Sequence, residues 1–212
     1  MNPKTRLMLV DDHAVVREGY RRLLECRPDL EIVSEANSAR QALEQYRLTT
    51  PDVIVLDLSL PDMGGVELIL RLMQRDRSAR ILVFSMHRDP LFASQALRAG
   101  ALGYVTKSSA PEELVQAVYQ VMARQRVISK DIAPELALAL LEQDSHPLKE
   151  LSPREFEILR MLVDGYSPEE IGQRLSISPK TVQNCHYQIK SKLGTKSDFE
   201  LSRLAIKLGL IA

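Results

Sequence analysis

Four short apolar segments in the first half of the chain each run directly into residues with polar side chains. The segments alternate with stretches in which apolar residues recur at helical spacing, which is the pattern of buried strands in a parallel sheet. The polar residues at their ends are Asp11, Asp12, Asp57, Ser85 and Lys107. Since functional groups in such sheets gather at the carboxyl ends of the strands, we expect these side chains to meet in one crevice.

Three carboxylates, a hydroxyl and an amine suit a Mg²⁺ ion and a phosphoryl group. Mg²⁺ prefers carboxylate oxygens, and a metal, a hydroxyl and an ammonium can together neutralise phosphoryl oxygens. An alternative is that the acidic residues only cap helices. For Asp12 alone the two interpretations stand on equal terms. Capping suits Asp57 poorly, because residues 58–65 separate it from the next helical pattern at Val66, and it does not explain Lys107.

The stretch from Asp57 to Gly65, read with the polar residues before and after it, resembles the receiver domain of bacterial response regulators over roughly residues 5–123. The resemblance implies that Asp57 is the phosphoacceptor, that Ser85 bonds the phosphoryl group and that Lys107 pairs with it. It also implies a switch made of Ser85 and the aromatic Tyr104. The Mg²⁺ ligands would be Asp11, Asp12, Asp57 and the backbone carbonyl of Ser59.

Length and periodicity predict two domains. The chain has 212 residues, and a receiver accounts for just over half of them. Five strands alternating with five helices predict a doubly wound, flavodoxin-like α/β domain with a five-stranded parallel sheet over residues 1–123. The last of its helices begins with Ser109-Ala110-Pro111-Glu112, a capping-box pattern. Residues 124–147 are expected to be a linker containing a short apolar helix over Ile132–Leu141.

Composition excludes several classes of protein. No apolar run approaches the roughly 20 residues of a membrane span, so no membrane association is expected. The two cysteines, Cys26 and Cys185, fall in different predicted domains, which argues against a disulfide or metal framework and favours the reducing cytoplasm. No further nucleophile, base and substrate pocket can be assembled from the chain, so an enzyme in the ordinary sense is not expected.

Residues 148–212 are predicted to form a small all-helical domain. Ser152-Pro153-Arg154-Glu155 and Ser167-Pro168-Glu169-Glu170 are capping boxes with Pro at the first helical position, and Gly165 lies between them as a helix-stop residue. The next cap, at residues 178–181, has no acidic residue in its first turn. A helix N-terminus without a local anion can accept one from outside, such as a DNA phosphate. The arrangement predicts a helix-turn-helix.

The last of these three helices has distinguishable faces. Its expected buried stripe is Val182, Cys185, Ile189 and Leu193. The residues left outside are Lys180, Gln183, Asn184, Tyr187, Gln188 and Ser191. Gln and Asn can read adenine edges, while Lys and Tyr can contact phosphates. A polar outer face can also be simply solvated, and on composition alone that interpretation is the stronger one.

The motifs of this domain favour DNA contact over a simply solvated face. The segments Leu151–Glu155, Leu175–Ser178 and Lys192-Leu193-Gly194 resemble the LuxR-type helix-turn-helix, and a receiver followed by this module resembles the NarL/FixJ-type response regulators, closest to the GacA/UvrY-type subgroup. The resemblance implies base contacts from Gln183, Asn184 and Tyr187. The implied phosphate contacts are Lys180, Thr181, Lys190 and Lys192.

The resemblance also implies partners. These would be a sensor histidine kinase as phosphodonor, double-stranded DNA, a second copy of the chain in the active state, and RNA polymerase as a further contact. The last helix, about residues 198–208, would form the dimer contact.

Two other functional classes remain open at this point: a helical domain that docks a protein instead of DNA, and a receiver that is never phosphorylated. The complete set of polar residues argues against the second.

Overall fold

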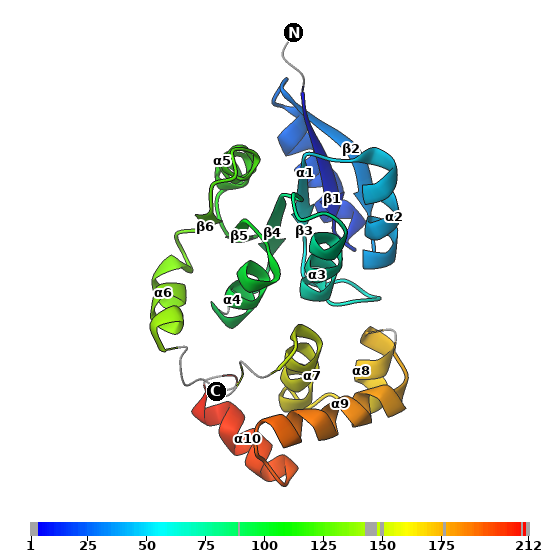
Figure 1. The fold of residues 1–212 in the computed structure, drawn as a ribbon, viewed down its shortest axis with the longest axis vertical. Helices are drawn as coiled ribbons and strands as arrows, with labels where there is room; N and C mark the ends of the chain where they lie inside the picture. Colours follow the sequence, from blue (N-terminus) through cyan, green and yellow to red (C-terminus); the bar gives the residue numbers. More distant parts are fainter. Residues whose placement is uncertain are drawn as a thin grey trace. The chain divides into compact units, whose positions relative to one another are not determined.

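The computed structural model describes residues 4–88, 90–142, 148, 151–175, 177–208 and 210. The chain divides into two compact units, Met1–Leu141 and Glu142–Ala212, and each is described by itself (Figure 1). Among the described residues, no helix has the length and apolar character that a membrane crossing requires.

The first unit is built on a parallel sheet with the strand order β2-β1-β3-β4-β5-β6. Its strands are β1 (Thr5–Val10), β2 (Leu30–Ala36), β3 (Val53–Leu56), β4 (Ile81–Ser85), β5 (Gly103–Thr106) and β6 (Val127–Ile128). The doubly wound parallel fold is confirmed, but the sheet has one strand more than the five predicted. The additional β6 pairs with Gly103 and Tyr104 of β5. Two residues are too few to show strand periodicity, so the sequence suggested only a connector there.

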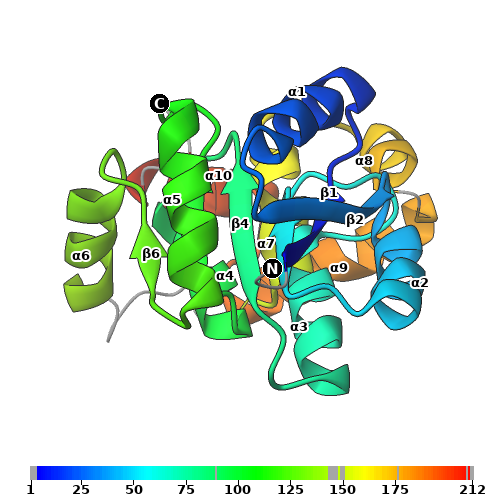
Figure 2. The ribbon, with the colours of Figure 1, turned by 90° about the horizontal axis from the view of Figure 1, so that it is seen from above.

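Helices cover both faces of this sheet (Figure 2). They are α1 (Ala14–Glu25), α2 (Ala39–Thr49), α3 (Gly65–Arg75), α4 (Pro90–Ala99) and α5 (Pro111–Met122). One core joins α1 and α5 to alternate strand residues such as Leu7, Val55 and Phe84. Because side chains alternate along a strand, the intervening buried residues, such as Met8 and Ile54, face the opposite side.

Two predictions about the end of this unit have different outcomes. The capping box at Ser109 is wrong: the N-cap of α5 is Ala110, which makes no side-chain cap bond, and the Ser109 hydroxyl instead lies 3.2 Å from that of Thr106. The predicted apolar helix is confirmed as α6 (Ala133–Glu142). Ile132 and Leu136 are fully buried, and the helix belongs to the first compact unit.

The secondary-structure elements among the described residues of the second unit are all helices. Its helices are α7 (Pro153–Val163), α8 (Pro168–Arg174), α9 (Pro179–Lys192) and α10 (Asp198–Lys207). Both predicted capping boxes are present, at Ser152 and Ser167. Gly165 follows α7 with φ +89°, a conformation that suits glycine at a helix end. At Gly172 a Cβ would lie 2.8 Å from the carbonyl oxygen of Ile177, so the turn between α8 and α9 requires glycine there.

Candidate functional site: an acidic pocket at the strand ends and an exposed helix

The carboxyl ends of β1, β3 and β5 bring two carboxylates onto one ammonium. Lys107 Nζ donates to Asp11 Oδ2 and to Asp57 Oδ2, each at 2.6 Å. All three side chains are nearly inaccessible, with exposed fractions of 6%, 8% and 4%. In the chain, Lys107 lies 96 positions from Asp11 and 50 positions from Asp57. Their meeting confirms the expectation that the strand ends converge.

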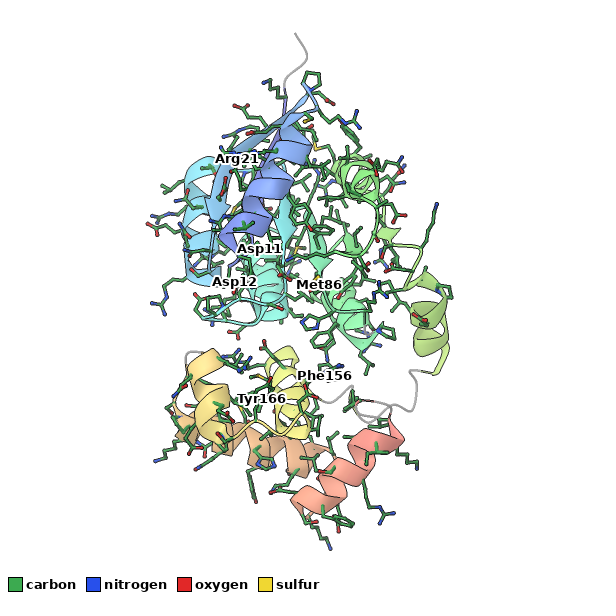
Figure 3. The ribbon with its side chains drawn as sticks, turned by 180° about the vertical axis from the view of Figure 1, so that it is seen from behind. Asp11, Asp12, Arg21, Met86, Phe156 and Tyr166 are labelled. Carbon is green, nitrogen blue, oxygen red and sulfur yellow. The ribbon has the colours of Figure 1, made fainter. Side chains whose placement is uncertain are left out.

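The strand order explains why the pocket forms here. The chain moves outward from β1 to β2, then returns to the other side of β1 with β3. At such a switch point the connections leave in opposite directions and open a crevice beyond the strand ends. Asp11 follows β1 and Asp57 follows β3, so both carboxylates lie at this crevice. Figure 3 labels Asp11 and Asp12 at this end of the sheet, where Met86 also follows β4.

The charges in the pocket are not balanced by Lys107 alone. Burial favours its neutral amine, but the charge of Asp57 and the hydrogen bonds to both carboxylates outweigh burial, so the pKa of Lys107 is raised above its usual value. The lysine is therefore an ammonium ion at neutral pH. One positive charge faces two buried carboxylates, and this surplus of negative charge favours a cation.

Asp12 lies beside this pair but does not cap the following helix. The N-cap of α1 is His13, with no side-chain cap bond, so the capping interpretation of Asp12 is wrong. His13 Nδ1 lies 2.6 Å from Asp12 Oδ1, and the His13 backbone N–H donates to Asp11. Potential ligand atoms of the three residues lie within 4.8 Å of one another. The donor set is mainly hard carboxylate oxygen, which fits Mg²⁺.

The other expected receiver residues meet around His87. Ser59 contacts Asp57 through its backbone N–H, which donates to Oδ1 at 3.3 Å, and its hydroxyl lies 3.2 Å from His87 Nε2. The fully buried Ser85 accepts from the His87 backbone N–H at 3.4 Å. The Tyr104 hydroxyl donates to the His87 carbonyl at 2.8 Å. His87 thus links the residues predicted to bind and to sense a phosphoryl group.

In the second unit, the N-terminal half of α9 presents an open polar face. Ser178 caps the helix by accepting from the Thr181 backbone N–H at 3.1 Å, and the first turn contains no acidic residue. All residues of the expected outer face are exposed, namely Lys180, Gln183, Asn184, Tyr187, Gln188 and Ser191, and Thr181 in the first turn is exposed as well. Within the described parts of the chain, Lys180 forms no salt bridge. Val182 and Ile189 are fully buried as expected, while Cys185 is half-buried.

The two lysines at the other end of α9 are already paired. Lys190 Nζ donates to Asp198 Oδ1 at 2.9 Å, and Lys192 Nζ donates to Glu155 Oε2 at 2.6 Å. The acceptors come from α10 and α7, respectively, so the sequence around α9 contained no sign of them. The expected phosphate contacts therefore divide into two groups. Lys180 and Thr181 are exposed at the N-terminus of the helix, where the Thr181 hydroxyl lies 2.8 Å from that of Ser178, whereas Lys190 and Lys192 are paired with carboxylates near the C-terminus.

Sequence reasoning missed several residues at these sites. His13 and His87 directly follow recognised residues, within one or two positions, and that adjacency was the available signal. His186, for which the sequence indicated no partner, is half-buried, and its Nε2 lies 2.9 Å from Asp198 Oδ1. Burial lowers the pKa of His186 despite the nearby carboxylate. No local pattern marks Asp198 as the common partner of two α9 side chains.

Comparisons with known proteins match both units. The response regulator receiver domain family matches residues 7–119, and the bacterial regulatory proteins of the luxR family match residues 149–205. The response regulator UvrY of Escherichia coli K12 is 37% identical over 96% of this chain and 94% of its own length. GacA of Pseudomonas aeruginosa is 36% identical over 97% of each chain. The structure of RcsB from Salmonella enterica serovar Typhimurium bound to promoter rprA has a TM-score of 0.67 and 27% identity, covering 94% of this chain and 97% of that one.

The chain therefore belongs to the response regulators of two-component systems, a class defined by the receiver domain. Its second unit is a LuxR-type helix-turn-helix, so it is a DNA-binding transcriptional regulator of the luxR family with UvrY and GacA among its relatives. The family resemblances seen in the sequence are confirmed, including the one to the GacA/UvrY-type subgroup.

Proposed function

We propose that a sensor histidine kinase transfers a phosphoryl group to Asp57 and that this modification controls DNA binding by α9. The observation that carries the proposal is the buried contact of Lys107 with both Asp11 and Asp57. An ion pair in this position holds a nucleophilic carboxylate next to a fixed positive charge. A regulator that binds chromosomal DNA would act in the cytoplasm.

Mg²⁺ would be held by Asp11, Asp12, Asp57 and the backbone carbonyl of Ser59. When bound, it would supply positive charge to the phosphoryl oxygens. The protein's own residues do the rest. An Asp57 carboxylate oxygen attacks phosphorus while the donor leaves, and Lys107 pairs with a phosphoryl oxygen. The receiver would in this way assist its own phosphorylation and dephosphorylation without acting on any other substrate.

The switch is proposed to run from Ser85 to Tyr104. A phosphoryl group on Asp57 adds charge and strong acceptor oxygens, to which the buried Ser85 hydroxyl would donate. Ser85 accepts from the backbone of His87, and His87 accepts from the Tyr104 hydroxyl. Movement of Ser85 would disturb that backbone segment and release Tyr104 from its hydrogen bond. The altered receiver surface would then favour a homodimer, in which two α9 helices read half-sites about one turn of DNA apart.

On DNA, the exposed half of α9 would enter the major groove. Gln183 and Asn184 can each make paired hydrogen bonds to adenine, and Tyr187 is 75% exposed beside them. Lys180 and Thr181 lie at the helix N-terminus, where backbone N–H groups also attract phosphate. RNA polymerase would contact the regulator once it is bound upstream of a promoter. The alternative output, docking to a protein instead of DNA, lacks the strong salt dependence that phosphate contacts produce.

Two measurements test this proposal. The intact protein is incubated with acetyl phosphate, with and without Mg²⁺, and labelling is followed by phosphate-affinity electrophoresis; the wild type should be labelled only with Mg²⁺, and Asp57→Asn not at all. Undiminished labelling of that variant would contradict the assignment.

The second measurement titrates selected DNA sites over a range of salt concentrations. Gln183→Ala should lose about 1–3 kcal/mol on the preferred site, whereas Lys180→Met should weaken all sites alike. Equal specificity ratios for the two variants would refute the face assignment.

A further inference from the structure

The chain segment after β6 is tied to the end of β5, the strand that leads into Lys107. Asp131 Oδ2 accepts from the Thr106 hydroxyl at 2.5 Å and from the Ser108 hydroxyl at 3.3 Å. The backbone N–H of Thr106 donates to the Ser129 hydroxyl at 3.3 Å. Both chain neighbours of Lys107 are therefore held by residues that immediately precede α6. Figure 2 shows β6 and α6 together at this edge of the sheet.

The segment itself is firmly packed. Thr106 and Ser129 are buried, and Ile132 fixes the start of α6 in the apolar interior. Asp131, by contrast, is exposed, so its carboxylate is not needed to fill space. Burial would raise the pKa of Asp131, but hydrogen bonds from Ser129, Thr106 and Ser108 outweigh it and lower the pKa, so the group is ionised at neutral pH. An ionised acceptor forms stronger hydrogen bonds than a neutral one.

We propose that Asp131 is a positioning residue for Lys107, which makes the segment leading into α6 part of the phosphorylation site. Lys107 has a long, flexible side chain that must reach both Asp11 and Asp57. Where its ammonium lies depends on the backbone at residues 106–108, and Asp131 holds the hydroxyl side chains on both sides of Lys107. The inference rests on the proposed phosphorylation of Asp57.

A purely structural role for Asp131, as an anchor of β6 and α6, predicts a different set of results. If Asp131 is only an anchor, its loss lowers stability and slows phosphorylation by the same factor whether or not Lys107 is present. If Asp131 positions Lys107, its loss slows phosphorylation only when Lys107 is present. It also depends on the hydroxyl of Thr106, not on its methyl group. These differences decide the design of the test.

The test measures initial rates of phosphorylation of the full chain by acetyl phosphate with Mg²⁺. Asp131→Ala and Thr106→Val should each slow the reaction about tenfold, as is usual when a group that orients a functional residue is removed. Thr106→Ser keeps the hydroxyl and should react at nearly the wild-type rate. Asp29→Ala is the matched control, because Asp29 likewise accepts a hydroxyl hydrogen bond, from Tyr119 at 3.0 Å, but lies outside the site; its rate should equal that of the wild type.

The same comparison is repeated in a Lys107→Gln background, where Asp131→Ala should cause no further loss. A wild-type rate for Asp131→Ala overturns the inference, and so does the same tenfold loss in both backgrounds. If Lys107→Gln reacts too slowly to measure, the Thr106 pair decides: equal rates for the Ser and Val variants refute positioning. Failure of the proposed function looks different, because the wild type is then unlabelled or Asp57→Asn is labelled.

Discussion

The ion pair between Lys192 and Glu155 predicts that Lys192 stabilises the second unit instead of contacting DNA. Glu155 Oε2 accepts from Lys192 Nζ at 2.6 Å and from the Ser152 backbone N–H at 2.7 Å. The carboxylate side chain is only 7% exposed, whereas the lysine is 38% exposed. The pair joins the C-terminal end of α9 to the first turn of α7, so its loss should loosen the packing of both helices.

The informative substitution is Lys192→Met, which retains an unbranched side chain and removes only the charge. Hydrogen bonds to charged groups contribute about 1.5–3 kcal/mol, and exposed ion pairs about 0.2–1 kcal/mol. Because one partner is buried and the other partly solvated, we expect the free energy of unfolding of this unit to fall by about 1–2 kcal/mol. Every 1 kcal/mol lowers the Tm of a domain of this size by about 4–8 °C.

Amide hydrogen exchange in α7 and α9 measures this loss in the intact chain, since it reports each unit separately. A double-mutant cycle with Glu155→Gln isolates the pair. Glu170→Gln is the matched control: Glu170 occupies the same capping-box position in α8, bonded to Ser167, and has no lysine partner within the described part of the chain. DNA titrations complete the test. Lys180→Met should reduce the slope of log affinity against log salt by about 0.9, and Lys192→Met should leave it unchanged.

The same pair predicts acid sensitivity. Burial raises the pKa of Glu155, but the hydrogen bonds from Lys192 and Ser152 outweigh it, so the folded-state pKa lies below the ordinary value. Its stabilisation is therefore complete above the unfolded-state pKa of about 4.3 and is lost as the pH falls through the folded-state pKa. Lys192→Met should reduce this part of the acid dependence. Unchanged exchange rates in Lys192→Met, together with a reduced salt slope, would refute the reasoning and restore Lys192 as a phosphate contact.

Two further substitutions test other features of the second unit. Gly172→Ala places a methyl group 2.8 Å from the Ile177 carbonyl oxygen and should cost about 1–3 kcal/mol by overpacking; urea unfolding measures it, and the helical Gly19→Ala, with open space around it, should be harmless. Asp198→Asn removes the negative charge that pairs with Lys190. The freed ammonium should raise the salt slope of DNA binding by about 0.9, and an unchanged slope would show that Lys190 does not reach the phosphates.

Short-range patterns in the sequence were sufficient to determine the elements apart from β6, and also the end of the sheet at which functional side chains gather. Apolar strands that run into Asp11, Asp57 and Lys107 determined the pocket, because parallel strands necessarily end at the same edge. The capping boxes at Ser152 and Ser167 located two helices to the residue, because a cap is formed within one turn of chain. The open face of α9 followed from helical periodicity in the same way.

Tertiary structure decided what each polar side chain contacts. Lys180 and Lys192 both lie on α9. Among the residues that the structure describes, Lys192 meets a carboxylate 37 positions away in the chain, whereas Lys180 meets none. Asp131 meets Thr106 across 25 positions, and β6 exists because β5 presents an edge for it to pair with. Periodicity records whether a residue faces inward or outward within its own element. Charge pairing depends on which other element packs there and on the exact reach of two side chains, and that information arises only when the chain is folded.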